Sequence, residues 1–149
     1  MERMRFMERP SRDELCMQIA CVVAKRGTCG RAQVGAILAR KGRVLATGYN
    51  GPPSGLPHCF DSNGCSNLDR VAENGCARSV HAEANCIAFA ARHGIRTEGA
   101  TLYCSHLPCL RCAELIINSG IRRVFYTNDY RIKEGEILLQ QAGVDIIKL

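Results

Sequence analysis

Two short motifs, far apart in the sequence, constrain this chain more than any other feature. The first is HAE at residues 81–83 and the second is PCLRC at residues 108–112. Imidazole and thiolate are ligands that zinc prefers, so His81, Cys109 and Cys112 form a candidate metal set. Three protein ligands leave a fourth coordination position open for water, which separates a catalytic zinc from a structural one. The motifs predict a catalytic zinc site and a fold that brings them together.

Helix geometry predicts a role for each residue of the two motifs. Pro108 suits the first turn of a helix, where its missing N–H leaves no bond unmade. Cys109 and Cys112 would then share one face of that helix, and the positive end of its dipole favours thiolates. Glu83 lies two residues after His81 and faces another way, so it is free for proton transfer.

This order of residues is the signature of zinc deaminases that act on nucleobases. We expect Glu83 to take a proton from water that attacks the amino-bearing carbon of a pyrimidine. The same carboxylate then passes protons to the ring nitrogen and to the departing ammonia.

Composition limits the class of protein. At 149 residues and 46% hydrophobic content, residues 1–149 suit one compact domain. No apolar run reaches membrane-spanning length and the opening MERMRFMERP is too charged for a secretion signal, so we expect a cytoplasmic protein that does not contact a membrane. Ten cysteines without such a signal indicate metal binding and buried thiols rather than disulfides. The net charge of +6 suits anionic ligands, or only a solvated surface.

Hydrophobic periodicity predicts alternating helices and strands. We expect helices at about 11–26, 81–93, 108–118 and 134–141, and strands at 34–38, 43–48, 100–104, 122–127 and 144–147. The first two strands read as a hairpin, which makes the sheet mixed. The predicted fold class is α/β, a three-layer α/β/α sandwich with a mixed five-stranded sheet. Prolines and glycines break up residues 51–80, a cysteine-rich insertion with no clear periodicity.

A second set of cysteines lies in or near this insertion. Cys29, Cys59, Cys65 and Cys76 are candidate ligands of a second, structural zinc, with His58 as a substitute ligand. Such a site would offset the entropy cost of ordering the long loop. The alternative is that these cysteines bind no metal. Other residues carry less information: we expect Cys21, Cys86 and Cys104 in the core, and His93 and His106 on the surface or packed.

Three stretches resemble the deoxycytidylate (dCMP) deaminase family. They are GYNGPPSGLPHC at 48–59, CARSVHAEANCIAFAARHG at 76–94 and TLYCSHLPCLRCAELIINSGI at 101–121. The resemblance implies the cytidine deaminase-like fold and conversion of dCMP to dUMP, upstream of thymidylate synthesis. It also implies a homo-oligomer, with a hexamer favoured, regulated by dCTP and dTTP. The cysteine-rich insertion is similar to that of members with a second zinc.

The resemblance also assigns roles to single residues. It implies that Asn50 contacts the nucleotide sugar and that Tyr130 lines the phosphate end, while Arg26 and Arg131 are phosphate candidates on charge and position only. Two bland alternatives stay open: Asn50 can form a tight turn, and Tyr130 can be a packed ring. The segment with Gly48, Gly51 and Gly55 resembles the regulatory nucleotide loop, although glycines equally suit an ordinary strand exit.

Four other functions compete with this interpretation. A deaminase acting on tRNA or single-stranded nucleic acid would need stacking aromatics in a basic groove, and this chain has no Trp, four Phe and four Tyr, so we expect no nucleic-acid partner. A nucleoside deaminase would act without the phosphate. A non-catalytic zinc-binding module would not need Glu83. A redox protein would use Cys109 and Cys112 as a reversible dithiol, which tight zinc binding excludes.

Overall fold

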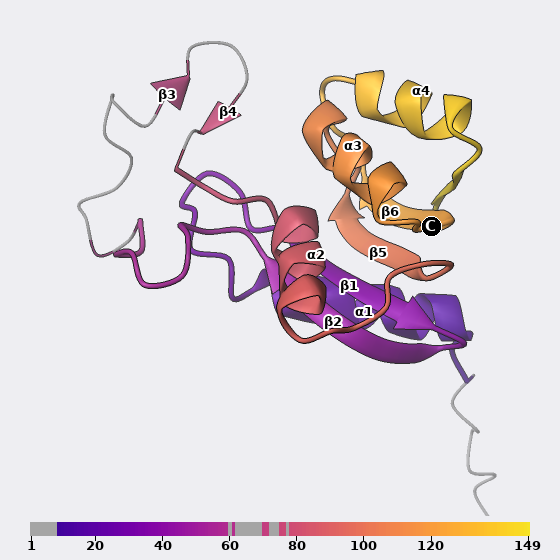
Figure 1. Ribbon diagram of the computed structural model, residues 1–149. Helices are drawn as coiled ribbons and strands as arrows, with labels where there is room; N and C mark the ends of the chain where they lie inside the picture. Colours follow the sequence, from indigo (N-terminus) through magenta and orange to yellow (C-terminus); the bar gives the residue numbers. More distant parts are fainter. Residues whose placement is uncertain (1–8, 60, 62–69, 72–74, 77) are drawn as a thin grey trace, which may run out of the picture.

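A mixed five-stranded sheet forms the centre of the molecule. The computed structural model describes residues 9–149 apart from 60, 62–69, 72–74 and 77. The helices are α1 (Arg12–Ala24), α2 (Ala82–Arg92), α3 (Leu110–Asn118) and α4 (Glu134–Gln141). The strands are β1 (Gly35–Arg40), β2 (Arg43–Tyr49), β3 (Arg70–Val71), β4 (Gly75–Cys76), β5 (Thr101–His106), β6 (Arg123–Asn128) and β7 (Asp145–Lys148). Figure 1 shows their arrangement.

The strand order of the sheet is β2-β1-β5-β6-β7. β1 pairs antiparallel with both β2 and β5, whereas β5, β6 and β7 run parallel to one another. The parallel strands are joined through α3 and α4, as parallel pairs require a crossover. A separate two-stranded ribbon, β3 and β4, lies within the insertion at 51–80. The carboxyl ends of β5 and β6 therefore lie at the same edge of the sheet.

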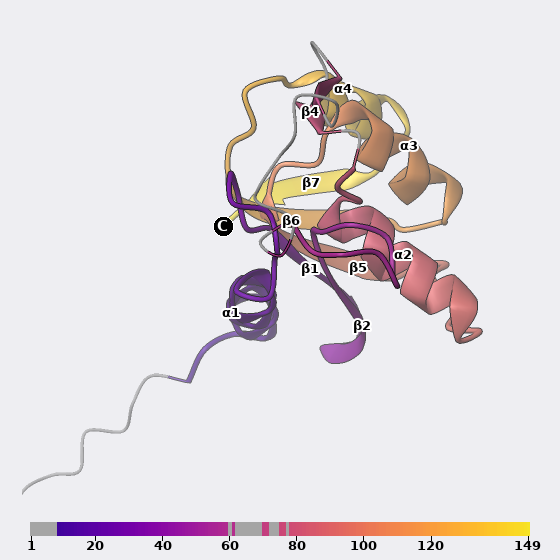
Figure 2. The same ribbon diagram turned by 90° about the vertical axis from the view of Figure 1, so that its left-hand side faces the viewer.

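On one face of the sheet, the covering layer is the helix α1 (Figure 2). Ser11 caps this helix in a capping box with Glu14. Cys16, Met17 and Ala20 pack on side chains of β1, β5 and β6, among them the stacked rings of Tyr103 and Phe125. Tyr103 also donates a hydrogen bond of 2.6 Å to Asp13 of α1.

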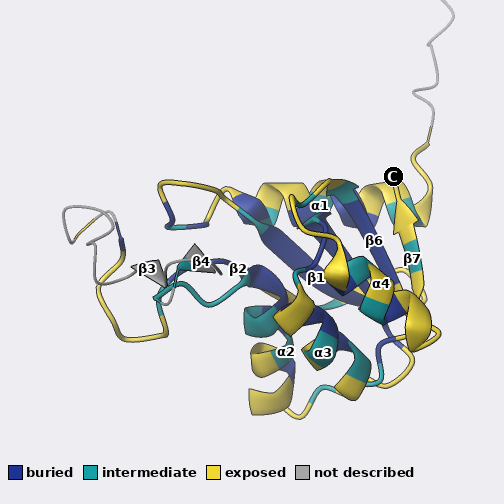
Figure 3. Ribbon diagram, turned by 90° about the horizontal axis from the view of Figure 1, so that it is seen from above, coloured by how far each residue is buried: buried dark blue, intermediate teal, exposed yellow. Residues whose placement is uncertain are grey.

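The other face carries α2, α3 and α4, which complete the third layer (Figure 2). Its core consists of small and aliphatic side chains, including Leu38, Leu102, Ile116 and Leu139. Figure 3 shows the burial running along the central strands, while the outward faces of the helices are exposed. No helix in the described part of the chain is long and apolar enough to cross a membrane.

Two glycines allow the helices to lie close to the sheet. A Cβ on Gly35 would lie 2.2 Å from the carbonyl oxygen of Ala20 in α1, and a Cβ on Gly48 would lie 2.3 Å from that of Ala82 in α2. Real Cβ atoms are not found so close to a backbone atom. Gly48 thus has a packing role in the sandwich, whatever else it does.

The predicted three-layer α/β/α fold with a mixed five-stranded sheet is confirmed. The predicted helix at 108–118 is corrected at its start, because it begins at Leu110 with Cys109 as its N-cap. Pro108 therefore precedes the helix instead of occupying its first turn. Cys86 and Cys104 are fully buried as expected, but Cys21 is exposed on α1 and does not belong to the core.

Candidate active site and metal centre

The first turns of α2 and α3 hold the three predicted metal ligands. His81 is the N-cap of α2 and Cys109 is the N-cap of α3, and neither side chain makes a capping hydrogen bond. His81 Nδ1 lies 3.4 Å from Cys109 Sγ and 3.5 Å from Cys112 Sγ. All three ligand atoms lie within 4.8 Å of one another. One imidazole nitrogen and two thiols at such spacing fit a tetrahedral zinc with one position open.

The electrostatics of this cluster favour a thiolate. The hydrogen bond from Cys112, together with one from His81, lowers the pKa of Cys109 to about 4. The hydrogen bond with Cys109 in turn raises the pKa of His81. The positive ends of two helices meet here, which also favours negative charge. The donor set is therefore prepared for a divalent cation that replaces the shared protons.

Glu83 lies in the first turn of α2 and is only 4% exposed. Burial raises the pKa of its carboxyl group, and the thiol of Cys104 on β5 donates a hydrogen bond to it. A raised pKa makes the carboxylate a stronger proton acceptor, as the first step of general acid–base catalysis requires. Its position in the same cavity as His81 and Cys109 fits the proton-transfer role that the sequence predicts.

A cavity of about 330 Å³ opens in front of these residues, at the carboxyl ends of β5 and β6. Ligands of α/β proteins bind at this edge of the sheet. The wall brings together residues from five segments of the chain: Cys29, Arg31, Ala32, Val34, Asn50, Cys76, Ser79, His81, Ala82, Glu83, His106, Leu107, Cys109, Tyr130 and Arg131.

Two of the predicted phosphate residues line this cavity and one does not. Tyr130 and Arg131, which follow β6, form part of the wall. Arg26 is exposed just beyond α1 and is not among the described lining residues. Arg31, which the sequence did not single out, lines the cavity instead. It lies in a loop without a motif or a periodicity that would indicate a binding site.

Asn50 lies at the edge of the cavity, where its side chain fastens a neighbouring loop. Its Nδ2 donates to the carbonyl oxygen of Ala32 and its Oδ1 accepts from the N–H of Val34, each at 2.8 Å. These two hydrogen bonds to the backbone satisfy the buried amide without any ligand. The second hydrogen of Nδ2 is the group left for the predicted contact with a sugar.

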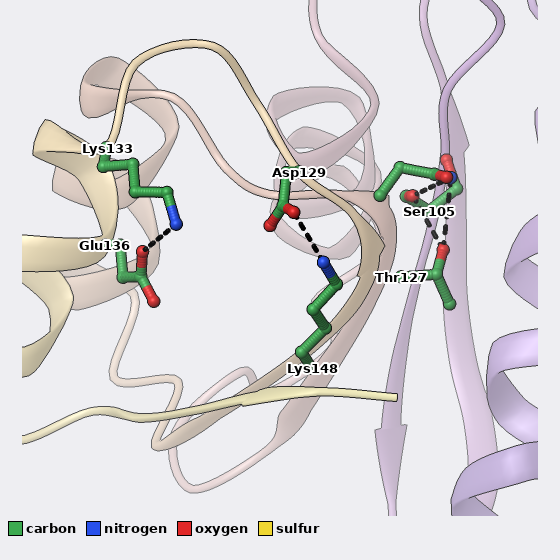
Figure 4. A network of polar contacts seen from close by, with 7 residues as sticks. Ser105, Thr127, Asp129, Lys133, Glu136 and Lys148 are labelled. Atoms are coloured by element: carbon green, nitrogen blue, oxygen red, sulfur yellow. Dashed lines mark hydrogen bonds and ion pairs between the residues drawn. The ribbon is translucent and has the colours of Figure 1, made fainter.

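His106 is a cavity residue that the sequence reasoning assigned to the surface or to packing. It ends β5, and its Nδ1 lies 3.0 Å from Ser105 Oγ. Ser105 is held in turn, because Thr127 and Asn128 donate to its carbonyl oxygen at 2.9 and 2.7 Å (Figure 4). The signal available in the sequence was its place at the end of a parallel strand just before PCLRC.

The second cysteine set is only partly described. Cys29 is buried and Cys76 half-buried, and both line the cavity, while Cys59 is buried in the insertion. Cys65 lies outside the described residues. Within the described part of the chain, His81, Cys109 and Cys112 form the group of three that meets as a metal cluster. His58, the substitute ligand, is exposed.

A second cavity, of about 850 Å³, lies beside the loop that follows β2. Gly48, Gly51 and Gly55 all line it, together with residues of α2 that include Asn85 and Arg92. Gly55 has a φ of +88°, which favours glycine, and a Cβ on Gly51 would lie 2.6 Å from Thr28 Oγ1.

Comparison with known proteins identifies the sequence type. The family model of the cytidine and deoxycytidylate deaminase zinc-binding region matches residues 10–128. ComE operon protein 2 of Bacillus subtilis is 40% identical over 94% of this chain and 72% of its own length. The deoxycytidylate deaminase of Mycobacterium phage D29 is 39% identical over 83% of this chain and 99% of its own length. The deoxycytidylate deaminase of Saccharomyces cerevisiae is 36% identical over 97% of this chain, which spans only 47% of that enzyme.

Solved structures of deaminases superimpose on this chain. The dCMP deaminase of cyanophage S-TIM5, in complex with dCMP and dUMP, superimposes with a TM-score of 0.81 at 34% identity, covering 96% of this chain and 100% of the other. A tRNA:A34 deaminase, at 23% identity and a TM-score of 0.61, shares the fold.

Proposed function

This chain belongs to the cytidine and deoxycytidylate deaminase family, and we propose that it deaminates dCMP to dUMP and ammonia with one catalytic zinc. The observation that carries the proposal is the His81, Cys109 and Cys112 cluster with buried Glu83 in the same cavity. The phage and yeast enzymes named deoxycytidylate deaminase, and the cyanophage structure with dCMP and dUMP, support the substrate.

The reaction replaces the C4 amino group of cytosine with oxygen from water. A zinc ion held by His81, Cys109 and Cys112 would supply Lewis-acid activation of that water. Glu83 accepts a proton as water adds to C4, and it protonates the ring nitrogen N3. Glu83 then takes the proton of the new C4 hydroxyl and passes it to the amino group as the C4–N bond breaks and the C4 carbonyl forms, which gives dUMP and ammonia. The raised pKa of Glu83 suits both directions of transfer.

The wall of the cavity also carries the positive charge that a phosphate needs. Arg31 and Arg131 line it together with Tyr130. Guanidinium groups bind phosphate oxygens in forked geometry, and a tyrosine hydroxyl adds one further donor. We infer that these three groups hold the 5′-phosphate. Asn50, at the cavity edge, keeps its predicted contact with the sugar.

The experiment that tests this function is ammonia release from a panel of dCMP, CMP, deoxycytidine and a cytosine- and adenosine-containing RNA. We expect turnover of dCMP with a kcat/KM at least tenfold above that of deoxycytidine, because the phosphate contacts are charge-assisted. Activity confined to nucleosides would reject the phosphate site. Activity on the RNA, with steeply salt-dependent binding, would favour a nucleic-acid deaminase.

We also propose a second, structural zinc held by Cys29, Cys59, Cys65 and Cys76. The burial of Cys29 and Cys59, and the shared cavity wall of Cys29 and Cys76, support it. Metal analysis of the pure protein should then give two zinc ions per chain. Cys76→Ser should lower this to one, whereas Cys21→Ser, on exposed Cys21, should not. A ratio of one in the unmodified protein contradicts the second site.

Regulation and assembly complete the proposal. The cavity lined by Gly48, Gly51 and Gly55 is the candidate site for dCTP or dTTP, with Arg92 as a cation for the phosphates. Exposed apolar side chains such as Leu15, Val22 and Ile137 support a homo-oligomer, with a hexamer favoured. Light scattering with and without dCTP and dTTP, together with rates under the same conditions, tests both. Rates that ignore both nucleotides contradict the regulatory site.

A further inference from the structure

His106 has one ring nitrogen fixed by the protein and one left for a ligand. Its Nδ1 lies 3.0 Å from Ser105 Oγ, and the half-buried ring lines the cavity that contains Glu83. In the described part of the chain, its Nε2 has no hydrogen-bond partner. The remaining question is whether this nitrogen is a donor or an acceptor.

The hydrogen bonds of Ser105 decide between the two tautomers. Ser105 is buried, and its Oγ accepts a hydrogen bond of 3.1 Å from the N–H of Gly35. A hydroxyl has a single proton to donate, and among the described residues the acceptor in reach is His106 Nδ1. Nδ1 therefore accepts, and in a neutral ring the proton must lie on Nε2. Burial lowers the pKa of His106, so the neutral form prevails at pH 7.

The support behind Ser105 keeps this arrangement in place. Thr127 and Asn128 of β6 both donate to its carbonyl oxygen, which fixes the end of β5 against β6 (Figure 4). His106 is also in register with Asn128. The donor is thus held on the rigid edge of the sheet, as recognition of a small molecule requires.

We propose that His106 is a substrate-recognition residue, whose Nε2–H donates a hydrogen bond to an oxygen of the nucleoside part of the nucleotide. This inference rests on the proposed function and extends it to a residue that neither the zinc motifs nor the phosphate contacts include.

The position of His106 favours the nucleoside over the phosphate. The residue lies three positions before Cys109, and its register partner Asn128 lies two positions before Tyr130. Through the chain and the sheet it is thus fixed close to both a metal-ligand candidate and a candidate phosphate residue, and it shares one cavity wall with them. A neutral donor suits a carbonyl or sugar oxygen, whereas Arg31 and Arg131 supply the charge that a phosphate needs.

The tautomer is tested first, without turnover. In the zinc-loaded protein labelled with ¹⁵N-histidine, the ¹⁵N shifts of His106 should show a bare Nδ1 and a protonated Nε2. Ser105→Ala removes the donating hydroxyl and should move the proton partly to Nδ1. A proton on Nδ1 in the unmodified protein overturns the inference.

The contact is tested by two substitutions of different chemistry. His106→Leu removes the donor and should lower kcat/KM for dCMP about tenfold. His106→Gln keeps an N–H at similar reach and should stay within about threefold of the unmodified enzyme. Both variants should melt within a few degrees of it. Equal losses in the two variants, or no loss in His106→Leu, overturn the proposal.

Binding of the product separates the nucleoside from the phosphate. Calorimetry with dUMP and with deoxyuridine should show the same fold-loss of affinity on His106→Leu. A loss confined to dUMP would place the contact on the phosphate and overturn the inference. If the unmodified protein does not turn over dCMP at all, the proposed function fails, while the ¹⁵N shifts still report whether Nε2 is a donor.

Discussion

At the scale of single residues, the chemistry depends on groups held at the first turns of two helices. His81 and Cys109 are N-caps, and Glu83 follows within the first turn of α2. Helix N-termini stabilise negative charge, so thiolates and a carboxylate can gather there at low cost. The same turns place Glu83 in the cavity wall beside His81 and Cys109, and buried against Cys104.

Glu83→Gln should abolish turnover without removing the metal. Loss of a general acid–base lowers kcat by about 100-fold to 10,000-fold. Burial raises the pKa of Glu83, so its charged form is penalised in the folded state; the neutral amide should leave the melting temperature unchanged or higher. Ammonia release, zinc analysis and thermal unfolding of one preparation check the three statements. Near-normal turnover contradicts the mechanism.

Arg31→Ala should raise the KM for dCMP about tenfold or more with little change in kcat, because a charge-assisted phosphate contact is lost. Arg26→Ala is the matched control, since Arg26 is exposed and outside the described cavity wall. Steady-state kinetics of both variants decide the point. An effect in Arg26→Ala alone would restore the prediction made from the sequence.

At the scale of elements, the site depends on how closely α2 lies against β2. The contact is set by Gly48, which faces the backbone of Ala82 and Cys86 at the start of α2. That turn also carries His81 and Glu83, so any displacement of α2 moves the candidate metal ligand and the candidate proton carrier together. Packing between two elements thereby controls the chemistry.

Gly48→Ala should destabilise the fold by about 3 kcal/mol, because the new methyl group overlaps backbone that cannot move freely. Gly94→Ala is the control: Gly94 has a φ of +64°, but no atom lies within 4 Å of the place its methyl group would take, so this change should cost only the backbone strain, about 1 kcal/mol. Urea unfolding of both variants measures the difference. Equal midpoints would mean that α2 adjusts to the methyl group.

At the scale of the whole molecule, the metal centre joins two parts of the helical layer. One ligand comes from α2 and two from α3, and these helices lie on the same face of the sheet (Figure 2). An ion bound by both helices stabilises the folded state by mass action, since the unfolded chain does not present the preformed site.

Removal of zinc should therefore lower the stability of the whole protein. With free zinc a thousandfold above its dissociation constant, binding adds about 4 kcal/mol, which chelation removes and added zinc restores. Calorimetry with and without chelator measures the shift. The double variant Cys109→Ser, Cys112→Ser should lose the part of the chelator-induced shift in melting temperature that comes from the catalytic zinc. Glu83→Gln should show the same shift as the unmodified protein. An unchanged melting temperature in the chelated unmodified protein contradicts this coupling.

Much of the fold and of the candidate metal site could be predicted from the sequence, because the interactions that specify them are local. The spacing in PCLRC and the capping box at Ser11 act within a few residues, and hydrophobic periodicity reports which face of each element is buried. The exact helix start at Leu110 was less predictable, since proline suits positions both before and within a first turn. The exposure of Cys21 likewise depends on which side of α1 meets the sheet.

The sequence by itself determined the order of helices and strands, and it singled out His81, Cys109 and Cys112 as candidate metal ligands and Glu83 as the candidate proton carrier, because these follow from residue type and short-range spacing. Only the tertiary structure decided which residues line the cavity. It brought in Arg31 and left out Arg26, and it placed His106 in the same wall as Glu83 and Cys109. The physical reason is that a cavity wall joins segments with no fixed spacing along the chain. The residue types of the two motifs predicted that His81 would lie close to Cys109 and Cys112. The fold decided which other residues share the cavity with them.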